Sequence, residues 1–127
     1  MNKDIELRDK IIFNGYDAKK YYGGIRHFSK LDINTLNSLI KLHFIDLYEC
    51  QNNSPTTEEI FEFMQKYPEY YTHGYTVDIL RKDYRMTLEG VGKDSAFDSE
   101  IEAKEFDQLF GQADEIDTSN TIYCWFD

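Results

Sequence analysis

The hydrophobic period of this chain changes at Tyr70, and this change constrains the fold more than any other feature. Between about residue 32 and Tyr70, apolar residues recur every three or four positions, as in amphipathic helices. From Tyr70 onward, apolar and polar residues alternate over two stretches, as in half-buried strands. The order of these segments predicts an α+β fold in which helices cover an antiparallel sheet.

Two helices are expected between residue 32 and the change of period. Asp32 is a candidate N-cap for a long central helix that runs to about Glu49 and leaves only a narrow polar face. Ser54 and Pro55 fit the N-cap and the first helical position of a second helix. Pro68 is expected to end that second helix.

Residues 2–30 show a mixed pattern that predicts less. The pattern could be a helix that ends near Asn14 and Gly15, a dipeptide that is also a strong turn signal. A short helical turn is expected over residues 17–22, before the next pair of glycines.

The strands are expected in the second half of the chain. Residues 71–79 and 84–90 alternate in polarity, with Tyr71, His73 and Tyr75 on one face of the first stretch, and predict a hairpin with a loop of about four residues. A capping-box pattern that begins at Ser99 predicts a helix up to Gly111. Residues 121–126 are β-branched and aromatic, which predicts a final strand.

The length and composition fit one domain, residues 1–127, since 127 residues of which 41% are hydrophobic can bury one core. The expected fold is α+β, with a small antiparallel sheet of at least three strands, formed by the hairpin and the C-terminal strand. Three to four helices are expected to pack mainly on one face. No apolar run approaches the roughly 20 residues that span a bilayer, and no secretory signal is visible, so a cytoplasmic location is expected.

Negative charge is concentrated at the C-terminal end. Residues 94–127 contain ten acidic residues and one basic residue, Lys104, and so carry −9 of the net charge of −10. A charge asymmetry of this kind predicts the sign of a partner and says little about reaction chemistry. We therefore expect an acidic face that binds a basic protein. Its candidate residues are Asp98, Glu100, Glu102, Glu105, Asp107, Asp114 and Glu115.

The hairpin is the segment richest in chemically versatile side chains. Arginine offers a forked set of donors and tyrosine offers a stacking face, so these residues could line a pocket for an anionic or planar ligand. The alternative is that the charged residues are solvated and the tyrosines pack in the core. The candidate pocket residues are His73, Tyr75, Arg81, Tyr84 and Arg85.

No motif indicates catalysis or metal binding. The glycine-rich run at residues 90–94 lacks the first glycine and the final hydroxyl of a phosphate-binding loop. His43, Asp46 and Cys50 would share one face of the expected central helix, but apolar residues share that face too, so His43 and Cys50 are more simply explained as core-facing residues than as metal ligands. No catalytic residue, metal ligand or cofactor is assigned.

These observations favour a non-catalytic acidic binding protein, such as an immunity protein, antitoxin or other inhibitor, that occludes a basic nucleic-acid-binding target. Direct binding to nucleic acid is disfavoured, because a chain of charge −10 would be repelled by phosphates. The alternative is a small-ligand-binding or regulatory module that uses the hairpin at residues 73–85, with a small enzyme as third choice. A monomer or a homodimer is expected, without a membrane partner.

Overall fold

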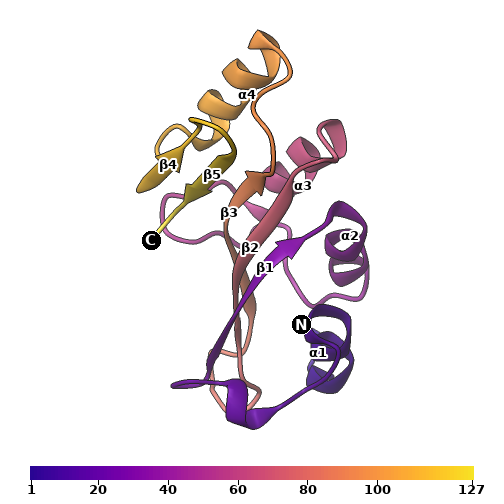
Figure 1. Cartoon of the computed structure of the whole chain (residues 1–127). Coiled ribbons are helices and arrows are strands. Elements are labelled where there is room, and N and C mark those ends of the chain that lie inside the picture. The colour runs from indigo at the N-terminus through magenta and orange to yellow at the C-terminus, as the bar shows by residue number, and fades with distance from the viewer.

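A computed structural model describes residues 1–127 and contains a five-stranded antiparallel sheet with four α-helices (Figure 1). The strands are β1 (Ile25–Leu31), β2 (Tyr71–Val77), β3 (Met86–Lys93), β4 (Glu115–Asp117) and β5 (Ile122–Trp125), in the spatial order β1-β2-β3-β5-β4. The helices are α1 (Ile5–Phe13), α2 (Ile33–Lys41), α3 (Thr57–Lys66) and α4 (Glu100–Phe110), with a short 3-10 helix, η1 (Ala18–Lys20). The expected α+β class, with a small antiparallel sheet and helices mainly on one face, is confirmed.

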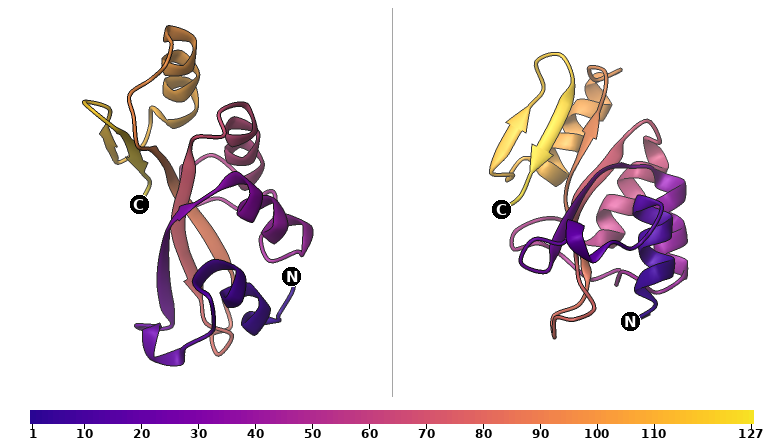
Figure 2. Two further views of the ribbon diagram at one scale, coloured as in Figure 1. Left: turned by 45° about the vertical axis from the view of Figure 1, so that its right-hand side comes forward. Right: turned by 60° about the horizontal axis from the view of Figure 1, so that its bottom comes forward.

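The helices lie on one side of the sheet, and the β4–β5 hairpin extends the sheet at the end near α4 (Figure 2). Phe28, Gly74 and Leu88 stand opposite one another on β1, β2 and β3, on the face that the helices cover. Gly74 is required there because a Cβ atom would clash with the backbone carbonyl of Thr87. The hydrophobic core fills the space between this face and helices α2, α3 and α4.

The central helix is shorter than its apolar pattern predicts. Asp32 caps α2 as expected, by accepting the backbone N–H of Thr35 at 2.8 Å. However, α2 ends at Lys41 and does not continue to Glu49. His43 adopts a φ of 64°, which a continuous helix does not allow, and the chain turns there. This turn carries Phe44 into the core.

The start of α3 also differs from the expectation. Its N-cap is Thr56 and not Ser54, because Thr56 and Glu59 form a reciprocal capping box. The hydroxyl of Ser54 instead accepts the N–H of Gln51 in the preceding loop, 2.8 Å away.

Helix α1 ends where the sequence predicts an end. Its C-cap is Asn14, which adopts the left-handed conformation with a φ of 69°.

The β2–β3 hairpin differs from the expectation in two ways. Its loop is longer, and β3 continues further at the end away from the loop. Its loop comprises residues 78–85 and is held by backbone hydrogen bonds from Arg81 to Asp78 and from Tyr84 to Arg81. At the other end β3 continues to Lys93, so Gly90 and Gly92 lie within the strand and not at its end. Strands β1 and β4 form the two sheet edges and were not expected from the sequence.

The C-terminal helix and strand occupy the positions expected for them. Phe106 and Phe110 of α4 are buried in the core, whereas Ile101 is 65% exposed. Ser99 caps α4 through the N–H of Glu102. The side chains of Ile122 and Cys124 on β5 enter the core. No helix in the structure combines the length and the apolar character needed to cross a membrane.

Candidate functional site

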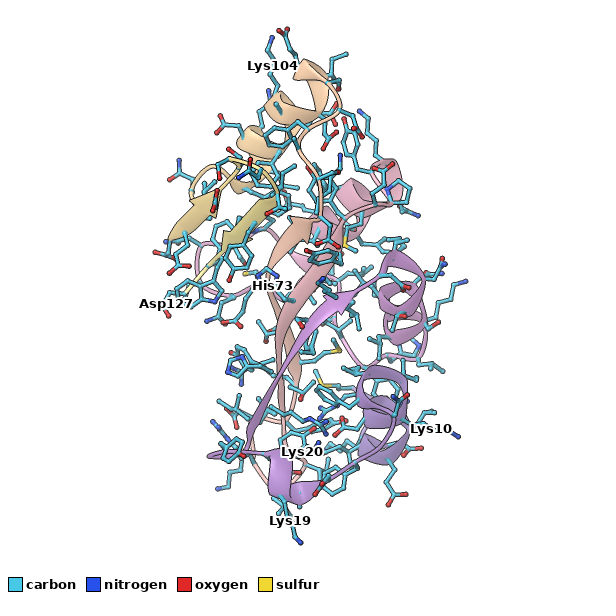
Figure 3. The ribbon with its side chains drawn as sticks, in the orientation of Figure 1. Lys10, Lys19, Lys20, His73, Lys104 and Asp127 are labelled. Atoms are coloured by element: carbon cyan, nitrogen blue, oxygen red, sulfur yellow. The ribbon has the colours of Figure 1, made fainter.

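The face of the sheet turned away from the helices carries a groove with aromatic walls. Strands expose alternate residues on each face, and the outward positions of β1, β2, β3 and β5 hold mostly aromatic, histidine and carboxylate side chains. The groove has a volume of about 390 Å³. The outward side chains that line it are His27, Ser29, Tyr71, His73, Glu89, Tyr123 and Trp125. Figure 3 shows His73 near the middle of the sheet, on the side of the C-terminus.

Two glycines of β3 make room for these rings. A Cβ atom on Gly90 would lie 2.9 Å from Nε2 of His73 and would clash with the carbonyl oxygen of Cys124. A Cβ atom on Gly92 would lie 2.7 Å from the ring of Tyr71. The glycines therefore allow the neighbouring aromatic side chains to lie over the backbone of β3.

His73 forms part of the floor of the groove. Its ring stacks on Tyr123, with ring centres 4.9 Å apart and planes 12° apart. Burial lowers the pKa of His73 to about 4, although the backbone of Cys124 acts in the opposite direction. The ring is thus uncharged at neutral pH, and its Nε2 atom is buried without a hydrogen-bond partner.

Glu89 places a carboxylate among the aromatic rings. The register between β2 and β3 shifts at His73 and Gly74, and Glu89 is the extra residue of the resulting bulge. The Glu89 side chain is 10% exposed. Its Oε2 accepts the indole N–H of Trp125 at 3.3 Å, and its Oε1 lies 3.8 Å from Nδ1 of His27. Burial raises the pKa of Glu89, while Trp125 and His27 oppose this effect.

One end of this face is closed by a hydrogen-bond network around Tyr75. Arg85 donates to the hydroxyl of Tyr75 at 2.8 Å, and that hydroxyl donates to Gln51 at 3.0 Å. Arg85 also lies 3.8 Å from the carboxylate of Glu49. Two of the hairpin residues proposed as a pocket, Tyr75 and Arg85, are therefore joined in this network.

Arg81 and Tyr84, the two remaining loop residues of the predicted pocket, lie away from this network. Arg81 binds the carbonyl of Gly23 at 3.0 Å and pairs with Asp83 in the loop. The hydroxyl of Tyr84 donates to the carbonyl of Asn2 at 3.0 Å, and its ring lies beneath the guanidinium group of Arg8. The hairpin residues are thus not brought together in one pocket, and only His73 lines the groove.

The acidic residues also divide into distinct groups. Glu102 is 1% exposed and does not belong to a solvent-exposed face, because it binds the buried ammonium group of Lys93 at 3.0 Å. Glu105 pairs with Lys66 on α3. The remaining candidates are exposed, namely Asp98, Glu100, Asp107, Asp114 and Glu115.

The tertiary structure brings part of this acidic segment beside the groove. Glu115 pairs in register with Trp125, and Asp117 pairs with Tyr123. Directly paired residues of antiparallel strands point to the same face, so both carboxylates flank the aromatic rings of β5. Asp94 lies at the opposite side of the groove, where it accepts the hydroxyl of Tyr71 at 2.7 Å.

The groove offers aromatic, imidazole and carboxylate groups for recognition. Cys124 is buried on the helix side, and burial raises its pKa to about 12, so it is not a thiolate at neutral pH. No group of three or more His, Cys, Asp or Glu side chains is placed to hold a metal ion. Sequence reasoning did not single out Glu89, Tyr123 or Trp125 as site residues, although the outward positions of β3 and β5 follow from strand alternation once the covered face is known.

Comparisons of this chain with protein families, with curated proteins and with solved structures find no match.

Proposed function

We propose that this protein is a non-catalytic binding protein that occludes a basic protein partner with the uncovered face of its sheet. The observation that carries this proposal is the pairing of Glu115 with Trp125 and of Asp117 with Tyr123, which sets carboxylates beside aromatic rings on one face. A few residues, often tryptophan, tyrosine or arginine, supply most of the affinity in protein interfaces, and charges raise the rate of encounter. The two classes of side chain needed for tight and rapid binding therefore share one surface.

An inhibitor of the immunity or antitoxin type fits this surface. A nucleic-acid-binding target presents basic side chains to phosphates and stacking groups to bases. Carboxylates next to Tyr123 and Trp125 offer the same combination of negative charge and flat rings. We place this activity in the cytoplasm, a proposal supported by the two cysteines, Cys50 and Cys124, which are unpaired in the structure.

The test is capture of a partner with the tagged protein from its own cells, followed by kinetics with the purified complex. We expect a basic partner in a 1:1 complex whose association slows as salt rises, because the Debye length falls from about 10 Å at 0.1 M to about 3 Å at 1 M. The double variant Glu115→Gln/Asp117→Asn should slow association at low salt. Glu58→Gln/Glu62→Gln on the exposed side of α3 removes the same charge elsewhere and should have a smaller effect.

Two results would contradict the proposal. One is the recovery of no partner at low salt. The other is an association rate that is equally sensitive to both double variants, since this would show that only net charge matters and that the uncovered face is not the interface.

A small-ligand-binding module is the second candidate, and the groove itself favours it. A volume of about 390 Å³ is in the range of small-molecule sites, and the side chains of His73, Tyr71 and Trp125 line it. A thermal-shift screen separates the two functions. A metabolite that raises the melting temperature by several degrees, and whose effect is lost in a variant of His73, would favour the ligand-binding module.

A further inference from the structure

Glu89 is a buried carboxylate that does not pair with any lysine or arginine side chain. Carboxylates are rarely buried unless they are paired with a cation or satisfied by several donors. Glu89 has only the indole N–H of Trp125 at 3.3 Å and the imidazole of His27 at 3.8 Å. The side chain of His27 is itself 74% exposed.

The other buried glutamate of this chain shows what full compensation requires. Glu102 accepts the hydroxyl of Tyr70 at 2.7 Å, the backbone N–H of Asp98 at 2.9 Å and the ammonium group of Lys93 at 3.0 Å. The carboxylate of Glu89, in contrast, binds neither an ammonium group nor a backbone N–H. Its remaining hydrogen-bonding capacity lies at a groove that is open to solvent.

The walls around Glu89 suit a flat cation. The rings of Trp125 and Tyr123 line the groove, and cations are attracted to the faces of such rings. A cation–π contact of this kind already occurs within the chain, where the guanidinium carbon of Arg26 lies 3.7 Å from the ring centre of Phe13. His73 adds no positive charge, because burial keeps its ring neutral at pH 7.

The charges near the groove favour a cation and disfavour an anion. Glu115 and Asp117 flank it on β4. The one lysine that lines it, Lys30, lies 3.6 Å from Asp94 and is balanced by this carboxylate. In Figure 3, Lys104 lies at the top of the molecule, Lys19 and Lys20 at its bottom and Lys10 on the side of α1, all away from His73.

We propose that this groove receives an arginine side chain of the basic partner, with its guanidinium group against the aromatic rings and hydrogen-bonded to Glu89. This inference rests on the proposed function and names the group that the uncovered face recognises. Arginine fits better than lysine because its planar guanidinium group stacks on rings, offers several donors to a carboxylate and is more weakly hydrated than an ammonium group.

The single tryptophan of the chain, Trp125, reports on this groove directly. The probe is the tripeptide acetyl-Gly-Arg-Gly-amide, titrated at constant ionic strength while Trp125 fluorescence is followed. The matched probe contains citrulline, which keeps the shape of arginine and removes its charge. We expect saturable binding of the arginine peptide with a dissociation constant of roughly 1–10 mM, and at least about tenfold weaker binding of the citrulline peptide.

Variants of the protein test the role of Glu89. Glu89→Gln should weaken binding of the arginine peptide by about tenfold and should increase the dissociation rate of the partner complex by a similar factor. Glu62→Gln, on α3, removes an exposed carboxylate from the other side of the molecule and should change neither. An unchanged melting temperature or an increase in Glu89→Gln would show that the loss of binding is not a loss of fold.

Each proposal can fail by itself. Equal binding of the two peptides, or full binding by Glu89→Gln, would overturn the arginine groove. If Glu115→Gln/Asp117→Asn then still slowed partner association, the proposed function would stand. If arginine amide bound as tightly as the peptide and no basic partner were captured, the groove would be a binding site for a small cation. That result would overturn both the protein partner and the proposed function.

Discussion

The ammonium group of Lys93 lies 3.0 Å from the carboxylate of Glu102, and the two side chains are 2% and 1% exposed. This ion pair joins the end of β3 to the first turn of α4. Burial by itself would raise the pKa of Glu102, but the N–H of Asp98, the hydroxyl of Tyr70 and Lys93 together hold it below its usual value. Part of the C-terminal acidity therefore serves to hold the fold together.

Removal of the cation from this pair should be costly. We expect Lys93→Met to lower the free energy of unfolding by about 3–5 kcal/mol, because it leaves a buried carboxylate uncompensated. The double variant Lys93→Met/Glu102→Gln should recover much of the loss. Lys66→Met, which breaks the more exposed pair with Glu105, is the control and should cost far less. Equal losses in Lys93→Met and Lys66→Met, measured by urea unfolding, would contradict this role of the buried pair.

The aromatic contacts of Phe106 should anchor α4 to the rest of the core. Its ring lies 5.1 Å from that of Phe110 and 6.4 Å from that of Phe63, and the residue is 3% exposed. Phe106→Ala should destabilise the protein by about 3–5 kcal/mol, the usual range for emptying a buried phenylalanine site. A loss below about 1 kcal/mol in urea unfolding would mean that the core does not depend on this helix.

The buried imidazole of His73 should make stability depend on pH. Its pKa is about 4 in the folded protein and 6.5 in a free histidine, so the unfolded chain takes up a proton first as the pH falls. Stability should therefore fall between about pH 6.5 and pH 4. We expect the wild-type protein to lose about 2–3 kcal/mol more than His73→Phe between pH 7 and pH 4.5. Parallel losses in the two proteins, measured by urea unfolding, would argue against a neutral buried ring.

The carboxylate of Glu89 should cost stability at neutral pH. Its pKa is raised in the folded protein, so it favours the folded state at low pH and this contribution is lost as the pH rises through the folded pKa. Glu89→Gln should thus leave stability at pH 7 unchanged or raise it by about 0.5–1 kcal/mol, while weakening binding at the groove. Marked destabilisation in thermal unfolding would instead identify Glu89 as a structural residue.

Local residue patterns predicted several elements correctly. Asp32 and Ser99 cap the helices that follow them, because an N-cap bonds only to backbone groups two or three residues away. The alternation after Tyr70 and the aromatic run before Asp127 predicted the strands, since side-chain period depends on the backbone of one strand alone. These features need no knowledge of distant contacts.

Contacts between distant segments settled the rest. Alternation assigns side chains to two faces but does not say which face the helices cover, and here the face with Tyr71, His73 and Tyr75 is the uncovered one. The end of α2 depends on the turn at His43 that brings Phe44 into the core.

The candidate site depends on the same long-range pairing. Glu89 and Trp125 are 36 residues apart in the chain and meet because β3, β5 and a bulge bring them together. Glu102 looks like any other acidic residue of its segment until the fold places it against Lys93. Charge and periodicity are local properties, whereas burial and pairing arise only when the sheet and helices close around a shared core.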